Sequence, residues 1–220
     1  GIGKTEVMRY LEYNMLQRKV PFASWHLEET KLRSVLGLVS YHQNQNLTRR
    51  DIIDSLGLHD VVEKSIKEIT KDELFYQFYM PDGSDTDDFI EQIRYLSQGC
   101  ECKYIFFEPI QDVVVGQSEE SKEQQLADLS VRLSKLAAEL NVGIVTIAHT
   151  NENGDPKYCK MIGQRASVII DLYRDKLAED DQERNTTQLR VEKNRPCSEE
   201  GNAGTLLFDS MSFTLQETHS

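Results

Sequence analysis

Hydrophobic positions recur along this chain with two spacings, one typical of helices and one typical of strands. Between residues 121 and 140 the leucines fall three and four positions apart. This spacing predicts an amphipathic helix with one apolar face toward the core. The same pattern predicts helices in the segment after residue 5, within residues 30–69 and over residues 87–98. We expect Thr48 to cap the helix that contains Ile52, and Gly57 and Gly99 to end helices.

Short continuous apolar runs predict strands. The runs lie at residues 21–27, 74–80, 103–107, 142–148, 167–173, 188–192, 205–208 and 212–215. Strands alternate with helices as far as His149, and strands alone follow. This order predicts an α/β fold: a mostly parallel central sheet of buried strands flanked by helices and extended by antiparallel C-terminal strands. We expect residues 1–220 to form one domain.

Composition narrows the class of protein. The chain has 220 residues, 39% of them hydrophobic, and no apolar run approaches the length of a membrane span. Membrane-spanning, collagen-like and disordered classes are therefore excluded. The net charge of -12 argues against a protein that covers nucleic acid with its whole surface, although a local basic loop is compatible with it. The acid-rich stretch 179–183 is expected to be a solvated loop.

The cysteines indicate free thiols in a reducing compartment. Cys100, Cys102, Cys159 and Cys197 form no regular disulfide framework. A zinc site on the first two would have to recruit His149 and Cys159, which is a contrived ligand set, so no zinc is expected. No signal peptide is expected from the N-terminal residues, which lack a basic and then apolar stretch.

The chain begins GIGKT, the second half of the phosphate-binding pattern GxxxxGK[ST]. Glycines such as Gly1 and Gly3 let backbone N–H groups turn toward phosphate oxygens, Lys4 neutralises the terminal phosphates, and Thr5 offers a hydroxyl to Mg²⁺. A chance match is the alternative, but an amphipathic helix follows at once, as in a true phosphate-binding loop. We expect an apolar strand and a further glycine to precede Gly1.

Polar residues close the predicted strands. Glu28 and Glu29 follow the run 21–27, Glu108 follows 103–107, and His149 follows 142–148. Because the carboxyl ends of parallel strands meet at one edge of a sheet, these side chains are expected to converge there with Lys4 and Thr5.

The order of these motifs resembles a known family. GIGKT, LEET, YIFFEPIQDVV, IVTIAHT, LRVEKNR and LLFD follow one another as in the C-terminal motor domain of hexameric replicative helicases. The T7-type primase-helicases and the mitochondrial helicase Twinkle are the nearest in pattern, and the DnaB group is more distant. The resemblance covers essentially the whole chain. It implies a RecA-like ATPase that uses ATP or another NTP with Mg²⁺, forms a homo-oligomeric, hexameric ring, and translocates on single-stranded DNA.

The resemblance also implies a setting for the chain. A primase domain or partner is expected upstream, and no membrane association is expected. The expected source is a phage, and the expected location is the cytoplasm of its host. The mitochondrial matrix is the alternative location.

Carried over by position, the resemblance assigns roles at the strand ends. Glu28 matches the acid that orients and deprotonates the attacking water, and Glu29 is the alternative residue for this role. Glu28 could also be a surface acid at a helix start without a catalytic role. Glu108 matches the metal-associated acid, which in the family is usually Asp followed by His, whereas Pro109 follows here. The longer glutamate side chain can still reach a metal, directly or through water. The altered geometry can instead slow hydrolysis. His149 matches the residue that senses the γ-phosphate. The alternative is a histidine that is merely hydrogen-bonded within the fold.

Later residues match the remaining parts of the family site. Arg195 in EKNR matches the finger that reaches the γ-phosphate of the neighbouring subunit, with Lys193 as its companion. Two exposed basic residues at a strand end are the alternative. Phe208 matches an aromatic residue that stacks on the nucleotide base, and Arg174 a basic residue near it, although ordinary packing or solvent exposure would also explain both.

For DNA, the segment after His149 offers Lys157 and Lys160, with Arg165 just beyond. Cations lining a pore bind phosphates even when the outer surface is acidic, and solvated surface is the rival explanation. The overall alternatives are a RecA-type recombinase, a KaiC-like ATPase, or a catalytically weak ring or scaffold protein.

Overall fold

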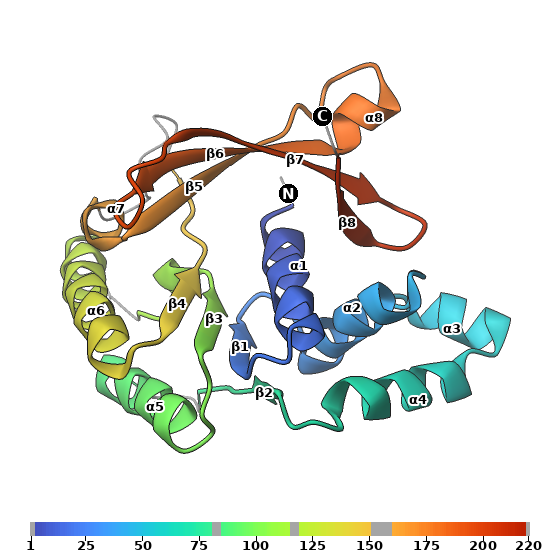
Figure 1. The fold of residues 1–220 in the computed structure, drawn as a ribbon, viewed down its shortest axis with the longest axis horizontal. Coiled ribbons are helices and arrows are strands. Elements are labelled where there is room, and N and C mark those ends of the chain that lie inside the picture. The colour runs from blue at the N-terminus through green and yellow to red at the C-terminus, as the bar shows by residue number, and fades with distance from the viewer. Residues whose placement is uncertain (1–2, 81–84, 115–118, 151–159, 219–220) are drawn as a thin grey trace. The chain divides into compact units, whose positions relative to one another are not determined.

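The computed structural model describes residues 3–80, 85–114, 119–150 and 160–218 of the chain (Figure 1). The chain divides into two compact units. The first comprises Gly1–Asn14, Leu32–Lys71 and Ser167–Ser220, and the second comprises Met15–Lys31 and Asp72–Ala166.

The second unit is built on a parallel sheet. Its strand order is β2-β1-β3-β4, with bounds β1 (Phe22–His26), β2 (Phe75–Gln77), β3 (Tyr104–Glu108) and β4 (Gly143–Thr146). Helix α5 (Thr86–Gln98) connects β2 to β3, and α6 (Glu119–Leu140) connects β3 to β4. The predicted α/β class and the parallel sheet are therefore confirmed.

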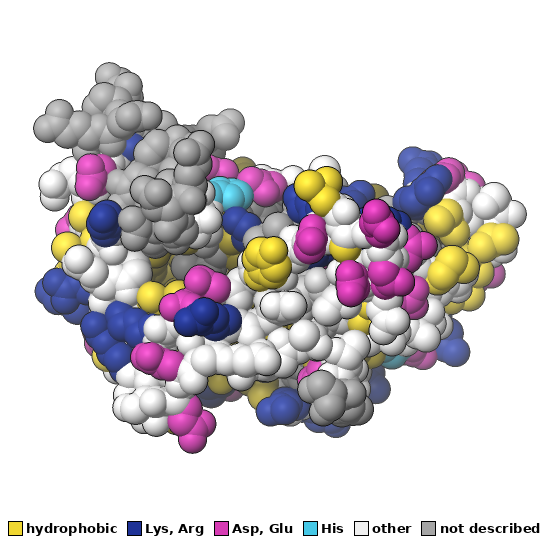
Figure 2. Space-filling model, turned by 90° about the horizontal axis from the view of Figure 1, so that it is seen from above, with side chains coloured by type: hydrophobic (Ala, Val, Ile, Leu, Met, Phe, Trp, Pro, Cys, Tyr) yellow, Lys and Arg dark blue, Asp and Glu magenta, His cyan; other side chains and the backbone are white. Residues whose placement is uncertain are grey.

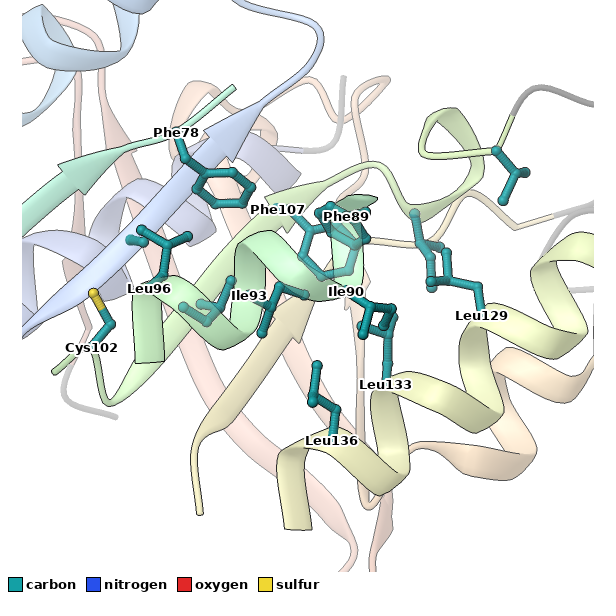
Figure 3. Close-up of a cluster of buried hydrophobic side chains, with 14 of the residues drawn as sticks. Phe78, Phe89, Ile90, Ile93, Leu96, Cys102, Phe107, Leu129, Leu133 and Leu136 are labelled. Atoms are coloured by element: carbon teal, nitrogen blue, oxygen red, sulfur yellow. The ribbon is translucent and has the colours of Figure 1, made fainter. Parts of the chain in front are cut away.

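The core of this unit lies between the sheet and the helices α5 and α6 (Figure 3). The α6 leucines predicted to face inward are buried at positions 126, 129, 133 and 136, and Leu140 packs at the border of the cluster. Phe89 of α5 meets Phe107 of β3 edge to face, with ring centres 5.0 Å apart. Helix α5 begins at a capping box in which Asp85 and Asp88 bond each other's backbone N–H groups.

The segment 142–148, predicted as a buried strand, is shorter and only half-buried as β4. The reason is its place at the end of the described sheet, where it has β3 as a neighbour on one side only.

The first unit carries the C-terminal strands as a separate antiparallel sheet in the order β5-β6-β7-β8. The strands are antiparallel as predicted, and among the described residues they pair into a sheet separate from the parallel one, which they were expected to extend. Their bounds are β5 (Val168–Tyr173), β6 (Thr186–Asn194), β7 (Gly201–Asp209) and β8 (Thr214–Glu217). The unit also holds most of α1 (Lys4–Gln17) and α2 (Lys31–Gln43), together with α3 (Arg50–Leu56), α4 (His59–Thr70) and the short α8 (Asp181–Asn185).

A buried arginine joins α1 to α2 within the first unit. Arg9 is fully buried and pairs with Glu6 on its own helix. A Cβ atom at Gly37 would stand 2.0 Å from Arg9 Nε, so only glycine leaves room for this side chain. The apolar stripe predicted for α1 did not reveal this charged contact.

Two local predictions in the first unit are wrong. Thr48 does not cap α3: the N-cap is Arg49, and the Thr48 hydroxyl instead donates to Asn46 Oδ1 at 2.8 Å. The stretch 179–183 is solvated as expected but partly helical, because the Asp180 side chain accepts from Glu183 N–H and starts α8. Gly57 does end α3, in the left-handed conformation.

Candidate functional site

The carboxyl ends of β1, β3 and β4 are held together beyond the strands themselves. Leu27 N–H donates to the Glu108 carbonyl at 3.0 Å, and Ile110 N–H donates to the Ile147 carbonyl at 3.0 Å. The residues that close these strands therefore lie at one edge of the sheet, as predicted for Glu28, Glu108 and His149.

At the end of β3, Glu108 is buried and paired. Its Oε1 lies 2.7 Å from Nδ1 of His26, and the two side chains are only 5% and 2% exposed. His26 and Glu108 are register partners on adjacent parallel strands, so their side chains leave the sheet on the same face. The acid predicted to associate with metal is thus fixed by a neighbour that the motifs did not single out.

Glu28 and His149 meet at the same edge but stand in a more open position. His149 Nε2 lies 3.5 Å from Glu28 Oε1, with side chains 42% and 55% exposed. Solvent screens such an exposed pair, so it contributes little to stability. Its importance is that it brings the Glu28 carboxylate and the His149 ring together. Glu29, the alternative acid, is half-buried, and its N–H donates to the His26 carbonyl at 3.4 Å.

Gln111 fixes the backbone of His149 from both sides. This side chain, on the short 3-10 helix η1 (Ile110–Asp112), donates through Nε2 to the His149 carbonyl at 3.1 Å and accepts from the His149 N–H at 3.2 Å. Gln111 is itself buried. The end of β3 therefore sets the position of the residue that closes β4.

The residues predicted to form a phosphate-binding loop belong to the first unit. Gly3 has φ +88°, a conformation that favours glycine, and its carbonyl accepts from Val7 N–H at 2.9 Å as α1 begins. Lys4 and Thr5 form the first turn of α1 and are half-buried. Gly1 lies outside the described residues.

The predicted basic pair lies at the end of β6. Lys193 is half-buried opposite Ile169 of β5. Burial lowers the pKa of Lys193, and the positive charge of Arg195 lowers it further. Arg195 is exposed, and its backbone N–H donates to the Ser167 carbonyl at 2.9 Å. The backbone at this strand end is thus anchored to the segment that leads into β5.

Arg174 and Phe208 lie close together in the first unit. The Arg174 guanidinium carbon lies 5.9 Å from the centre of the Phe208 ring, a cation–π distance. Arg174 also donates to Asn185 Oδ1 at 2.8 Å and to the Arg184 carbonyl. Phe213 packs against Phe208 edge to face, with ring centres 5.2 Å apart.

Of the predicted DNA-contacting residues, Lys157 lies outside the described part of the chain. Lys160 is exposed just before α7 (Met161–Arg165), and Arg165 is exposed at the end of that helix. Basic as well as acidic side chains appear on the face drawn in Figure 2, so the net charge of -12 does not make that surface uniformly negative.

The chemistry of the donors bears on which metal the chain suits. Thr5 and Glu108 offer oxygen ligands, which Mg²⁺ prefers, and Mg²⁺ retains several waters and uses few protein groups. The described residues contain no group of three or more His, Cys, Asp or Glu arranged to hold a metal ion. Burial raises the pKa of the Cys102 thiol to about 12.

The sequence motifs did not point to His26 or Gln111, although both lie close in sequence to predicted site residues. A weak signal existed for His26, because it stands two positions before Glu28 and breaks an apolar strand with a polar group. Its partner lies 82 residues away, and only the register of β1 against β3 reveals the contact.

A parallel sheet with strand-end acids, accompanied by antiparallel C-terminal strands, defines a RecA-like α/β domain. The chain belongs to the DnaB-like helicase C terminal domain family, whose model matches residues 1–214. The resemblance to replicative helicase motors is thereby confirmed, and the matching family is the DnaB group. No helix in the described ranges is long and apolar enough to cross a membrane.

Two solved structures support the fold. One, an ATPase domain, aligns with 100% of this chain and 82% of its own, at a TM-score of 0.79 and 16% identity. The other, a structure of "a DnaB-like replicative helicase and its interactions with primase", aligns with 100% of this chain at a TM-score of 0.73 and 17% identity. This chain spans 55% of the length of that second chain. Among curated proteins, none matches significantly.

Proposed function

We propose that this chain is the NTP-hydrolysing motor of a replicative DNA helicase that forms a ring and moves along single-stranded DNA. Family membership supports the proposal. The observation that carries it is the convergence of Glu28 and His149, 3.5 Å apart, at the same sheet edge as the buried Glu108. A general base, a metal-associated acid and a polar group for the γ-phosphate are parts that NTP hydrolysis uses.

In this proposal Glu28 orients the attacking water and accepts its proton. Its carboxylate is exposed enough to meet water, while the contact with His149 holds it at the strand end. His149 contacts the γ-phosphate, and Lys4 neutralises the terminal phosphates within the loop that contains Gly1 and Gly3. Glu29 serves as the natural control because it follows Glu28 directly but is half-buried.

Thr5 and Glu108 are the residues proposed to hold Mg²⁺, directly or through water. Bound Mg²⁺ would neutralise negative charge on the phosphates. The protein's own contribution is to keep the Glu108 carboxylate in one place, which its burial and its contact with His26 accomplish.

Residues of the first unit complete the proposed site from a neighbouring copy or around the base. Arg195, with Lys193 beside it, is proposed to reach the γ-phosphate of the adjacent subunit, which makes hydrolysis depend on ring assembly. Phe208 is proposed to stack on the nucleotide base. The contacts of Arg174 suit a residue that holds Phe208 in place beside that base.

Single-stranded DNA is the proposed track, bound by Lys157, Lys160 and Arg165. A hexameric ring of this chain and a primase domain or partner are the proposed assembly, by analogy with the DnaB-like helicase whose interactions with primase are known. The proposed location is the cytoplasm, that of the host if the source is a phage.

The test is NTP hydrolysis by the native full-length protein with and without single-stranded DNA. We expect DNA to stimulate turnover, Glu28→Gln to reduce kcat by about 10² to 10⁴, the range of general-base contributions, and Glu29→Gln to leave it within about threefold. An equal loss of kcat in both variants would show that Glu28 is not the specific general base. DNA-independent, very slow turnover in the wild type would favour the catalytically weak scaffold, for which the Glu108-Pro109 departure is the motivating feature.

A further inference from the structure

We infer that His26 is a positioning residue for Glu108: its Nδ1 hydrogen bond selects one orientation of that carboxylate and so sets the affinity of the site for its divalent cation. The inference rests on the proposed function for the identity of the cation. It concerns a residue that neither the motifs nor the resemblance assigned.

The contact is built into the sheet. His26 and Glu108 end neighbouring parallel strands in register, and Leu27 N–H donates to the Glu108 carbonyl at 3.0 Å. Both side chains emerge on the face of the sheet where Phe22 packs on Phe106, opposite the core formed with α5 and α6. Since their backbones are fixed in this way, only side-chain rotation remains to be controlled.

The need for control follows from the identity of residue 108. Glutamate has one more rotatable bond than the aspartate expected from the resemblance, and fixing such a side chain costs conformational entropy. The 2.7 Å contact between His26 Nδ1 and Glu108 Oε1, at 2% and 5% exposure, restricts that bond before any cation arrives. An ionised carboxylate only accepts hydrogen bonds, so Nδ1 is then the donor. A carboxylate can accept several hydrogen bonds, and the bond from His26 uses only part of that capacity.

Two substitutions separate the hydrogen bond from mere packing. In His26→Asn the side-chain amide nitrogen takes the place of Nδ1 and preserves a donor toward Glu108. In His26→Gln the amide lies one bond further out, near the place of Nε2, and the donor is displaced. Both variants remain polar and buried at the same position, so they form a matched pair.

The primary measurement is Mn²⁺ binding by the full-length protein with ADP, followed by electron paramagnetic resonance at a temperature where each variant is folded. Partners of ligating residues typically contribute about 10- to 100-fold to metal affinity. We therefore expect His26→Gln to weaken Mn²⁺ binding at least about tenfold, and His26→Asn to stay within about threefold of the wild type. The Mg²⁺ concentration for half-maximal hydrolysis should shift by the same factors, with the KM for nucleotide at saturating Mg²⁺ unchanged.

Equal Mn²⁺ affinity in the wild type and in His26→Gln would overturn the inference, as would equal weakening by both substitutions. Absence of Mn²⁺ binding by the wild-type protein with ADP would overturn it as well. Failure of the proposed function has a different signature: the wild type would not hydrolyse NTP, while the Mn²⁺ affinities would still report on the pair.

Discussion

The two units of the chain hold their candidate residues in different ways. At the parallel-sheet edge of the second unit, Glu108 is buried against His26, and the backbone of His149 is clamped by Gln111. At the end of β6 in the first unit, the backbone of Arg195 is anchored and its side chain is exposed. Groups of the first kind have positions fixed by burial or by hydrogen bonds within their own chain, whereas a long exposed side chain gains much of its order from the partner that it meets.

This contrast predicts two kinds of defect. Substitutions at the sheet edge should impair the subunit that carries them, and they should act through the placement of neighbouring groups. Substitution of Arg195 should leave its own subunit intact and disable the site that it reaches.

The largest effect is expected for Arg195→Ala. Loss of a guanidinium that stabilises the transferred phosphoryl group lowers kcat by about 10³ to 10⁵. The thermal unfolding midpoint should not change, because the side chain is exposed. Steady-state hydrolysis and calorimetry check both parts. Arg190→Ala, an exposed substitution on β6, the strand that ends just before Arg195, is the control, and an equal loss of kcat there would remove the distinction between the two arginines.

A smaller effect is expected for Gln111→Met. Methionine keeps a similar length but removes both hydrogen bonds to the His149 backbone. Loss of hydrogen bonds to these half-buried backbone groups costs about 1–3 kcal/mol of stability, and the displaced His149 should lower kcat about tenfold. Chemical denaturation and single-turnover hydrolysis measure the two changes. A variant with lost stability but unchanged kcat would show that the clamp does not position His149 for catalysis.

The smallest effect on activity is expected for Gly37→Ala. The added methyl group would meet the buried Arg9 side chain, and such overpacking costs about 1–3 kcal/mol of stability. Because neither residue belongs to the proposed site, kcat at a temperature below unfolding should stay within about twofold of the wild type. Differential scanning calorimetry alongside hydrolysis checks this. A loss of kcat without a loss of stability would connect Arg9 to the phosphate loop instead.

The features that could be predicted from the sequence share a physical basis. The leucine spacing of α6 and the apolar runs of β1 and β3 are local patterns, and the burial of side chains follows from them directly. The convergence of Glu28, Glu108 and His149 also followed, because parallel strands must end at one edge.

The rest depends on contacts between distant positions. A histidine in a strand has no local feature that points to a glutamate 82 residues later, and the burial of Arg9 depends on a glycine in another helix. The Thr48 cap failed for a local reason instead, because the hydroxyl donates to the side chain of Asn46, two residues earlier. Half-burial of β4 reflects its place at the end of a sheet, which no segment of sequence specifies alone.

The central claim is that Glu28 of one subunit and Arg195 of a neighbour act on the same nucleotide. Glu28→Gln and Arg195→Ala full-length proteins, each inactive alone, should regain NTP hydrolysis when they are mixed and allowed to reassemble, because some interfaces then combine an intact Glu28 with an intact Arg195. Recovery of a substantial fraction of wild-type turnover is the predicted result. Mixtures that assemble into rings but stay as inactive as the separate variants would contradict the account.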